Sequence, residues 1–116
     1  MKFAWDNYKK FAWGHDELNP LAKNQKNWLH LGLTIIDSID TLYIMGLEKE
    51  YGEAKDFISK IDFEVDKSSS VFEMNIRILG GLVSIYSLTR EQVFLDQAKK
   101  FEDILLHVKK KKIIFY

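Results

Sequence analysis

Two charged residues one helical turn apart are the first candidates for chemistry in this 116-residue sequence. Glu73 and Arg77 are four residues apart, so they share one face of a helix. Such a carboxylate could take part in acid–base catalysis. It could also be structural, because Ser70-Val-Phe-Glu73 has the form of a capping box, in which the glutamate satisfies the first turn of a helix. The spacing alone favours the structural role.

A second cluster contains Asp37, Asp40 and Thr41, which lie among isoleucines and leucines. Buried carboxylates must be hydrogen-bonded, paired with a cation or protonated, because bare burial of a charge is too costly. A paired-acid or metal-binding role is one interpretation. We favour the more frequent one, a structural hydrogen-bond network that caps neighbouring helix ends.

The other reactive residue types do not form a recognisable site. The sequence has no cysteine, which excludes disulfides, thiolate zinc sites and cysteine nucleophiles. The histidines lack the HxxxH and HExxH spacings of metal sites. Tryptophans could stack on sugars, although they more commonly fill a helical core. The residues concerned are His15, His30 and His107 and Trp5, Trp13 and Trp28.

Composition describes one small packed domain. Hydrophobic residues make up 47% of the chain and aromatic residues 14%, which excludes global disorder. Of the 17 basic residues, four are Lys109–Lys112, so residues 1–108 carry a net charge of −4. This mildly acidic body argues against nucleic-acid binding. The N-terminus lacks the apolar segment of a signal peptide, and no stretch is expected to span a membrane.

Helices with two kinds of apolar pattern alternate along the chain. Segments 33–45 and 71–88 are apolar on nearly every face, which predicts burial on all sides. Segments 47–60 and 91–107 are amphipathic, and Thr89-Arg-Glu-Gln92 predicts a capping box before the latter. This alternation predicts an incomplete all-α fold with inner and outer helical layers. The remaining expectations are a first helix ended by Gly14, loops at 23–27 and 62–69, and close packing or ligand approach at Gly80-Gly81.

Three segments, in order, resemble glycoside hydrolase family 47, the class I α-1,2-mannosidases. They are AWDNYKKFAWGHDELNPL, GLTIIDSIDTLYIMGL and SVFEMNIRILGGLVSIYSLT. The resemblance covers residues 3–106. It implies the first helical hairpins of an (α/α)7 barrel, incomplete here, and inverting hydrolysis of terminal α-1,2-linked mannose from high-mannose N-glycans. It also implies residence in the lumen of the endoplasmic reticulum or Golgi, with any membrane anchor belonging to a parent protein.

The resemblance assigns roles to two residues. Glu73 matches the family's proposed proton donor, and Arg77 matches the arginine one turn later that contacts the glycan. Asp37 and Asp40 match a family motif, but they are not among the family's usual catalytic carboxylates. The resemblance also implies a calcium ion, whose threonine ligand and the further catalytic carboxylates are expected outside this chain, so no metal ligand is assigned here.

The resemblance divides the chain at residue 108. Residues 1–108 are expected to be the N-terminal part of a mannosidase catalytic domain, and 109–116 an aberrant basic and apolar tail. The expected function is that of a glycosidase, truncated here and inactive alone. The alternative is a non-catalytic homologue that binds glycans or takes part in glycoprotein degradation. A helical interaction module without sugar chemistry is the third hypothesis.

Overall fold

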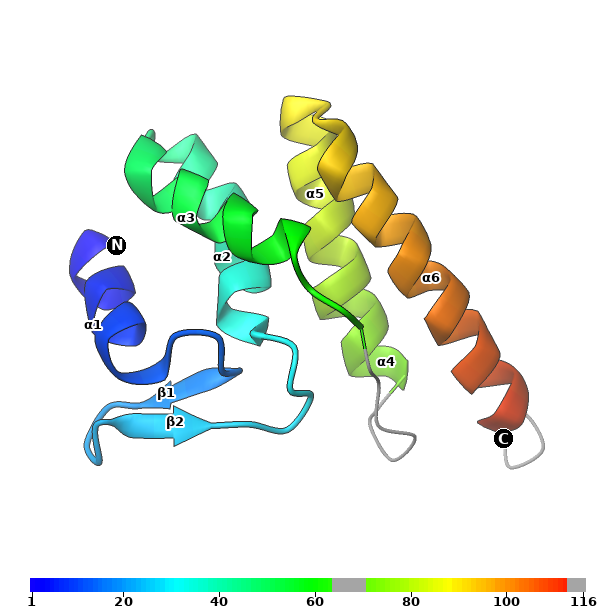
Figure 1. The fold of residues 1–116 in the computed structure, drawn as a ribbon, viewed down its shortest axis with the longest axis horizontal. Helices are drawn as coiled ribbons and strands as arrows, with labels where there is room; N and C mark the ends of the chain where they lie inside the picture. Colours follow the sequence, from blue (N-terminus) through cyan, green and yellow to red (C-terminus); the bar gives the residue numbers. More distant parts are fainter. Residues whose placement is uncertain (64–70, 113–116) are drawn as a thin grey trace.

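The computed structural model describes residues 1–63 and 71–112, with side chains described as far as His107. Helices dominate these residues, and a short β-hairpin follows the first helix (Figure 1). In chain order the elements are α1 (Lys2–Ala12), β1 (Glu17–Asn19), β2 (Asn24–Lys26), α2 (Leu33–Ile44), α3 (Glu48–Ser59), α4 (Val71–Glu73), the π-helix η1 (Met74–Leu79), α5 (Gly80–Thr89) and α6 (Gln92–Lys112).

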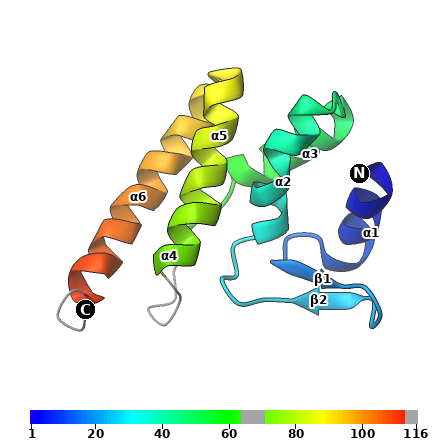
Figure 2. The same ribbon diagram turned by 180° about the vertical axis from the view of Figure 1, so that it is seen from behind.

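The helices form two layers, as the alternating apolar patterns predict. The inner helices α2 and α5 pack against each other, α3 covers α2, and α6 covers α5 (Figures 1 and 2). Helix α3 also contacts α6, so the two outer helices adjoin each other. The helical-hairpin prediction is therefore confirmed. Completely buried residues of the core include Ile35, Ile36 and Ile39 of α2, Ile58 of α3, Ile78 of η1, Leu82 and Ile85 of α5, and Phe94 and Phe101 of α6.

The prediction that the inner helices are buried on every face is wrong. In α2 the Ile44 side chain is 71% exposed, and in α4 the Phe72 side chain is 68% exposed. The apolar pattern itself is present, but burial needs a neighbour on each side. The described residues pack α2 between α3 on one side and η1 and α5 on another. The inner helices therefore keep some large apolar side chains exposed, among them Ile44 of α2 and Val83 of α5.

One helical stretch is long and apolar enough to cross a membrane, judged by length and composition only. The stretch Val71–Thr89 is 19 residues long and contains an 18-residue window with a mean hydropathy of 1.3; it is the one such helix within the residues described. The stretch contains Glu73 and Arg77 and packs against α2 and α6. Core helices of globular domains pass the same test of length and composition, so the finding is weak support for a membrane span.

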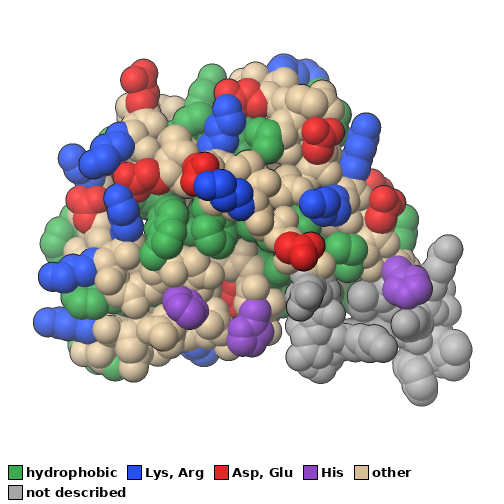
Figure 3. Space-filling view, in the orientation of Figure 1, with side chains coloured by type: hydrophobic (Ala, Val, Ile, Leu, Met, Phe, Trp, Pro, Cys, Tyr) green, Lys and Arg blue, Asp and Glu red, His purple; other side chains and the backbone are tan. Residues whose placement is uncertain are grey.

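Acidic and basic side chains are interspersed over the face shown in Figure 3.

The β-hairpin corrects the prediction of a loop at residues 23–27. Strands β1 and β2 pair antiparallel, with Leu18 opposite Gln25. All residues of β2 are exposed and polar, so the strand lacks the alternating pattern by which strands are recognised in sequence. The first helix ends at Ala12, and Gly14 follows with a positive φ of 82°, as a helix-terminating glycine should.

The boundary between α5 and α6 also differs from its predicted capping box. Thr89 is the last residue of α5, and its hydroxyl donates to the Ile85 carbonyl. The Gln92 side chain donates to Asp96 rather than back to Thr89. Helix α6 then continues to Lys112, beyond the predicted end at residue 107 and through the lysine run. Ser70, the first residue of the other capping box, and residues 113–116 lie outside the described residues, as does most of the predicted loop 62–69.

The paired glycines at the start of α5 have different surroundings. A Cβ added at Gly81 would lie 3.0 Å from both Cγ2 and the carbonyl oxygen of Ile36 in α2. A Cβ added at Gly80 would meet only the Asn75 carbonyl oxygen, at an ordinary 3.7 Å. Close helix packing, one of the two roles considered for this pair, therefore accounts for Gly81.

Alanine substitutions at these two positions should have opposite effects. We expect Gly81→Ala to lower the free energy of unfolding by about 1–3 kcal/mol, because the Ile36 backbone cannot easily move away. Gly80→Ala should raise it by up to about 1 kcal/mol, since alanine favours the helix. Urea unfolding followed by circular dichroism measures both. Equal effects of the two variants would contradict this account of the packing.

Candidate active site

The two candidate residues of the long inner helix lie at a break in its regular α geometry. Glu73 ends α4, and Arg77 lies within the π-helical segment η1 that follows. Segments of π-helix are rare and occur frequently at functional sites. The sequence predicts one continuous α-helix here, because nothing in its residue pattern separates the two helix types. The π-helical segment is therefore a feature that the sequence analysis missed.

Arg77 is the centre of the site. Its Nη2 and Nε atoms donate to Oδ2 of Asp37 in α2, at 2.8 and 3.1 Å. Its Nη1 atom lies 3.9 Å from Oε2 of Glu73. The Arg77 side chain is 32% exposed and that of Glu73 39%, so both groups are accessible to a ligand. The structure therefore brings the proposed acid, the arginine and Asp37 together.

Trp28 completes the cluster, which contains Glu73, Arg77, Asp37 and Trp28. The Arg77 Cζ atom lies 5.4 Å from the centre of the Trp28 ring, a distance suited to a cation–π interaction. The sequence suggests a helical core or sugar stacking for Trp28 and gives no link to Arg77. No local signal could have found the pair, since 49 positions separate the two residues along the chain.

The two aspartates of α2 connect the inner helices. Asp37 accepts the bonds from Arg77, while Oδ2 of Asp40 accepts a hydrogen bond from the Ser84 hydroxyl at 2.9 Å. The other oxygen of Asp40 accepts from the Thr41 backbone N–H at 2.8 Å. A structural network is therefore present, but it links two adjacent helices rather than capping their ends. Spacing along one helix could not identify partners on another.

The electrostatics of Asp37 reflect its position between the helices. Partial burial raises the pKa of this carboxyl above its ordinary value, and the negative charges of Asp40 and Glu73 act in the same direction. The hydrogen bonds and positive charge of Arg77 lower the pKa, but less than these effects raise it. Arg77 thus favours the charged form of Asp37 against the effects of burial and of the neighbouring carboxylates.

The other candidates of the sequence lie away from this cluster. Trp5 is buried in the core, and Trp13 lies edge-on to it at 5.6 Å between ring centres. His15 contacts the Asn27 side-chain amide at 2.6 Å, while His30 and His107 are exposed. Trp5 therefore belongs to the buried core, as the commoner role predicts, and Trp13 and Trp28 are both partly buried against that core; Trp28 also contacts Arg77.

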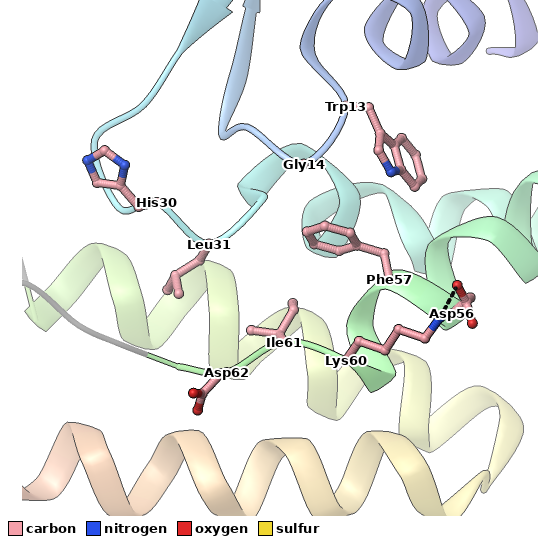
Figure 4. A pocket seen from close by; sticks show the side chains of 9 residues that line it. All are labelled: Trp13, Gly14, His30, Leu31, Asp56, Phe57, Lys60, Ile61 and Asp62. Carbon is pink, nitrogen blue, oxygen red and sulfur yellow. Dashed lines mark hydrogen bonds and ion pairs between the residues drawn. The ribbon is translucent and has the colours of Figure 1, made fainter.

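A separate cavity of about 290 Å³ lies between the β2–α2 loop and the end of α3 (Figure 4). Trp13 and Phe57 meet edge to face on one side of it, with ring centres 5.7 Å apart. His30 and Leu31 line it from the loop. None of the four residues of the Arg77 cluster lines this cavity, so it is distinct from the candidate active site.

The calcium ion implied by the family resemblance was tested against the donor groups. Calcium requires six to eight oxygen ligands, mostly from carboxylates and carbonyls. Among the residues described, no group of three or more His, Cys, Asp or Glu side chains could hold a metal ion. Asp37 is already committed to Arg77, and Asp40 to Ser84. The described residues do not fit the ion, so no chemical step is assigned to it here.

Comparison with known proteins agrees with the family resemblance seen in the sequence. The family profile described as Glycosyl hydrolase family 47 matches residues 1–113. Over 104 residues the chain is 49% identical to the human (Homo sapiens) endoplasmic reticulum mannosyl-oligosaccharide 1,2-alpha-mannosidase, an alignment that covers 89% of this chain and 15% of that protein. It is 45% identical over 108 residues to an Arabidopsis thaliana mannosyl-oligosaccharide 1,2-alpha-mannosidase, covering 91% of the chain and 19% of the relative.

An insect protein gives a similar match. The chain is 45% identical over 114 residues to a Drosophila melanogaster mannosyl-oligosaccharide alpha-1,2-mannosidase, covering 91% of this chain and 17% of that protein. The chain therefore spans less than one fifth of the length of each of these three relatives.

Proposed function

Because this chain belongs to glycosyl hydrolase family 47, we propose that it serves the hydrolysis of terminal α-1,2-linked mannose from high-mannose N-glycans. The names of its relatives support the mannosidase activity. The name of the human relative also supports a place in the secretory pathway, and we propose the lumen of the endoplasmic reticulum or Golgi. The single observation that carries the proposal is the cluster in which Arg77 joins Glu73 and Asp37.

In the proposed reaction Glu73 is the general acid. Its carboxyl proton passes to the glycosidic oxygen as the bond between that oxygen and C1 of the mannose breaks. Water adds to C1 from the opposite face and releases its proton to a second carboxylate, which inverts the configuration. Asp37 is not proposed as that base, because both of its hydrogen bonds from Arg77 go to the same oxygen and fix the group beside the guanidinium.

Arg77 is proposed to bind the sugar. A guanidinium presents five N–H donors, of which two are used by Asp37. We assign mannose hydroxyl groups to the donors that Asp37 does not use, which include the Nη1 group beside Glu73, and Asp37 keeps the guanidinium plane in one orientation. A calcium ion held by residues other than those described here would supply charge for binding sugar hydroxyls and water.

The 116-residue chain on its own should release no mannose from a high-mannose glycan. It spans 15% of the human relative, and its inner helices expose apolar side chains that need further partners. Mass spectrometry of a mannose-rich glycan incubated with the chain and calcium measures the release. Calcium-dependent loss of hexose units would contradict this expectation.

A hybrid enzyme tests the function itself. In the hybrid, the matching 104-residue segment of the human relative is replaced by this sequence. We expect the hybrid to remove α-1,2-linked mannose and to leave α-1,6-linked mannose intact. A correctly folded hybrid that binds the glycan without cleaving it would instead favour the non-catalytic, glycan-binding homologue.

A further inference from the structure

One buried carboxylate organises the loop that joins the β-hairpin to α2. Asp16 has no solvent-exposed surface, and its side chain accepts five backbone hydrogen bonds. Five charge-assisted bonds on one carboxylate leave it little freedom to move. The donors to Oδ2 are the N–H groups of Trp28 (2.8 Å), Leu29 (2.5 Å) and His30 (2.8 Å), and those to Oδ1 belong to Leu31 (3.0 Å) and Leu33 (3.2 Å).

The backbone of Asp16 is fixed by the two ends of the same loop. At the start of the loop, Oδ1 of Asn27 accepts the Asp16 N–H at 2.9 Å. At its end, the Thr34 hydroxyl and N–H donate to the Asp16 carbonyl at 2.7 and 3.0 Å. The loop and the first two residues of α2, together called loop 27–34 here, therefore wrap around Asp16 along their whole length.

The loop adopts a backbone conformation that local preferences do not favour. His30 has a φ of 59°, in the left-handed region that residues with a Cβ seldom occupy. Such a residue persists only where its surroundings determine the conformation. Its N–H is one of the five donors to Asp16. Loss of the carboxylate would therefore leave this conformation with little support.

The ring of Phe57 confines the loop from the opposite direction. A Cβ added at Gly32, whose φ is 71°, would lie 2.6 Å from Cε1 of Phe57. Figure 4 shows the Phe57 ring beside this loop, at the cavity that His30 and Leu31 also line. The loop is thus held between the Asp16 carboxylate and the Phe57 ring. These two groups leave the loop backbone few other positions.

The first residue bound by Asp16 is Trp28, whose ring lies over the Arg77 guanidinium. We propose that Asp16 is a positioning residue for the candidate active site. By fixing loop 27–34, it holds Trp28 on Arg77 and so keeps the guanidinium beside Asp37 and Glu73. The inference rests on the proposed function in one respect, the identity of the sugar that Arg77 binds. The positioning of Trp28 and Arg77 is a property of the chain without substrate.

Fluorine NMR of the 116-residue chain labelled with 5-fluorotryptophan tests the proposal. The chain has three tryptophans and so gives three resonances, which Trp→Phe variants assign. Arg77→Met defines the position of the Trp28 resonance without its cationic partner. We expect Asp16→Asn to move the Trp28 resonance to that position while Trp5, which is buried in the core away from this loop, keeps its own.

The matched control is Gln97→Met. Gln97 is also a buried polar residue bound to backbone, but it donates to the carbonyls of Ile58 and Ile61, at the end of α3. The Gln97→Met substitution should lower the free energy of unfolding and leave the Trp28 resonance unchanged. If Asp16→Asn abolishes folding, Asn27→Ala, which removes the acceptor of the Asp16 N–H and the contact with His15, should shift the Trp28 resonance part of the way. A Trp28 resonance that stays in the wild-type position in the folded Asp16 or Asn27 variant would overturn the proposal, whatever the mannosidase assays show.

Discussion

Glu73→Gln should lower the rate of mannose release by the hybrid enzyme by about 10²–10⁴-fold, the range that a general acid contributes. Glutamine keeps the size of the side chain and its capacity to accept a hydrogen bond, but it cannot give a proton to the leaving oxygen. The loss should appear in kcat, with little change in KM, since the proton transfer occurs in the transition state. Steady-state assays on an α-1,2-linked mannobiose give both constants.

The control for this prediction is Glu48→Gln. Glu48 is exposed in the first turn of α3, outside the cluster of Glu73, Arg77, Asp37 and Trp28. Its substitution should leave the rate within about twofold of the parent hybrid. Circular dichroism establishes whether the Glu73 variant keeps its helices, which separates catalysis from the capping role that its sequence context also suggests. Full activity in a folded Glu73→Gln variant would remove this residue as the acid.

Asp16→Ala should lower the free energy of unfolding of the chain by at least about 3 kcal/mol. The substitution leaves five backbone N–H groups without their acceptor, and each unsatisfied buried donor costs about 1–3 kcal/mol, reduced where water enters. Chemical unfolding followed by circular dichroism measures the change. Asp6→Ala, at an exposed position of α1, is the control and should change stability by no more than about 0.5 kcal/mol.

The stability that Asp16 contributes should depend on pH in a defined direction. Burial alone would raise the pKa of this carboxyl, but the N–H groups of the loop outweigh it, so the pKa in the folded chain lies below its ordinary value. A depressed folded pKa stabilises the folded state above the unfolded pKa of about 3.9. The contribution is lost as pH falls from there through the folded value. The difference between wild type and Asp16→Ala should therefore shrink on acidification, and a constant difference between pH 6 and pH 2 would contradict this account.

The contrast between Asp16 and Glu73 shows the limits of sequence reasoning. Glu73 lies in a long motif whose residues are sufficient to identify it as a candidate. Asp16 lies in another of the matched segments, yet no pattern marks it as the centre of a loop, because its partners are backbone N–H groups. Backbone groups are the same at every residue, so their hydrogen bonds leave no trace in residue types.

The apolar patterns determined the helices but not their burial. Ile44 and Phe72 fit the predicted apolar faces, yet both are largely exposed in the described residues. Periodicity reports which residues would favour contact with other apolar groups. Whether a neighbouring helix covers them depends on the rest of the fold.

By itself, the sequence determined the helical class, the inner and outer helices, the family, and the adjacency of Glu73 and Arg77. These follow from periodicity and from motifs, which are local along the chain. Only the tertiary structure decided that Arg77 pairs with Asp37 and Trp28, that a π-helical segment carries it, and that Asp16 holds the loop beside it. The physical reason is that these contacts join residues more than ten positions apart or depend on backbone geometry, and folding alone brings such groups together.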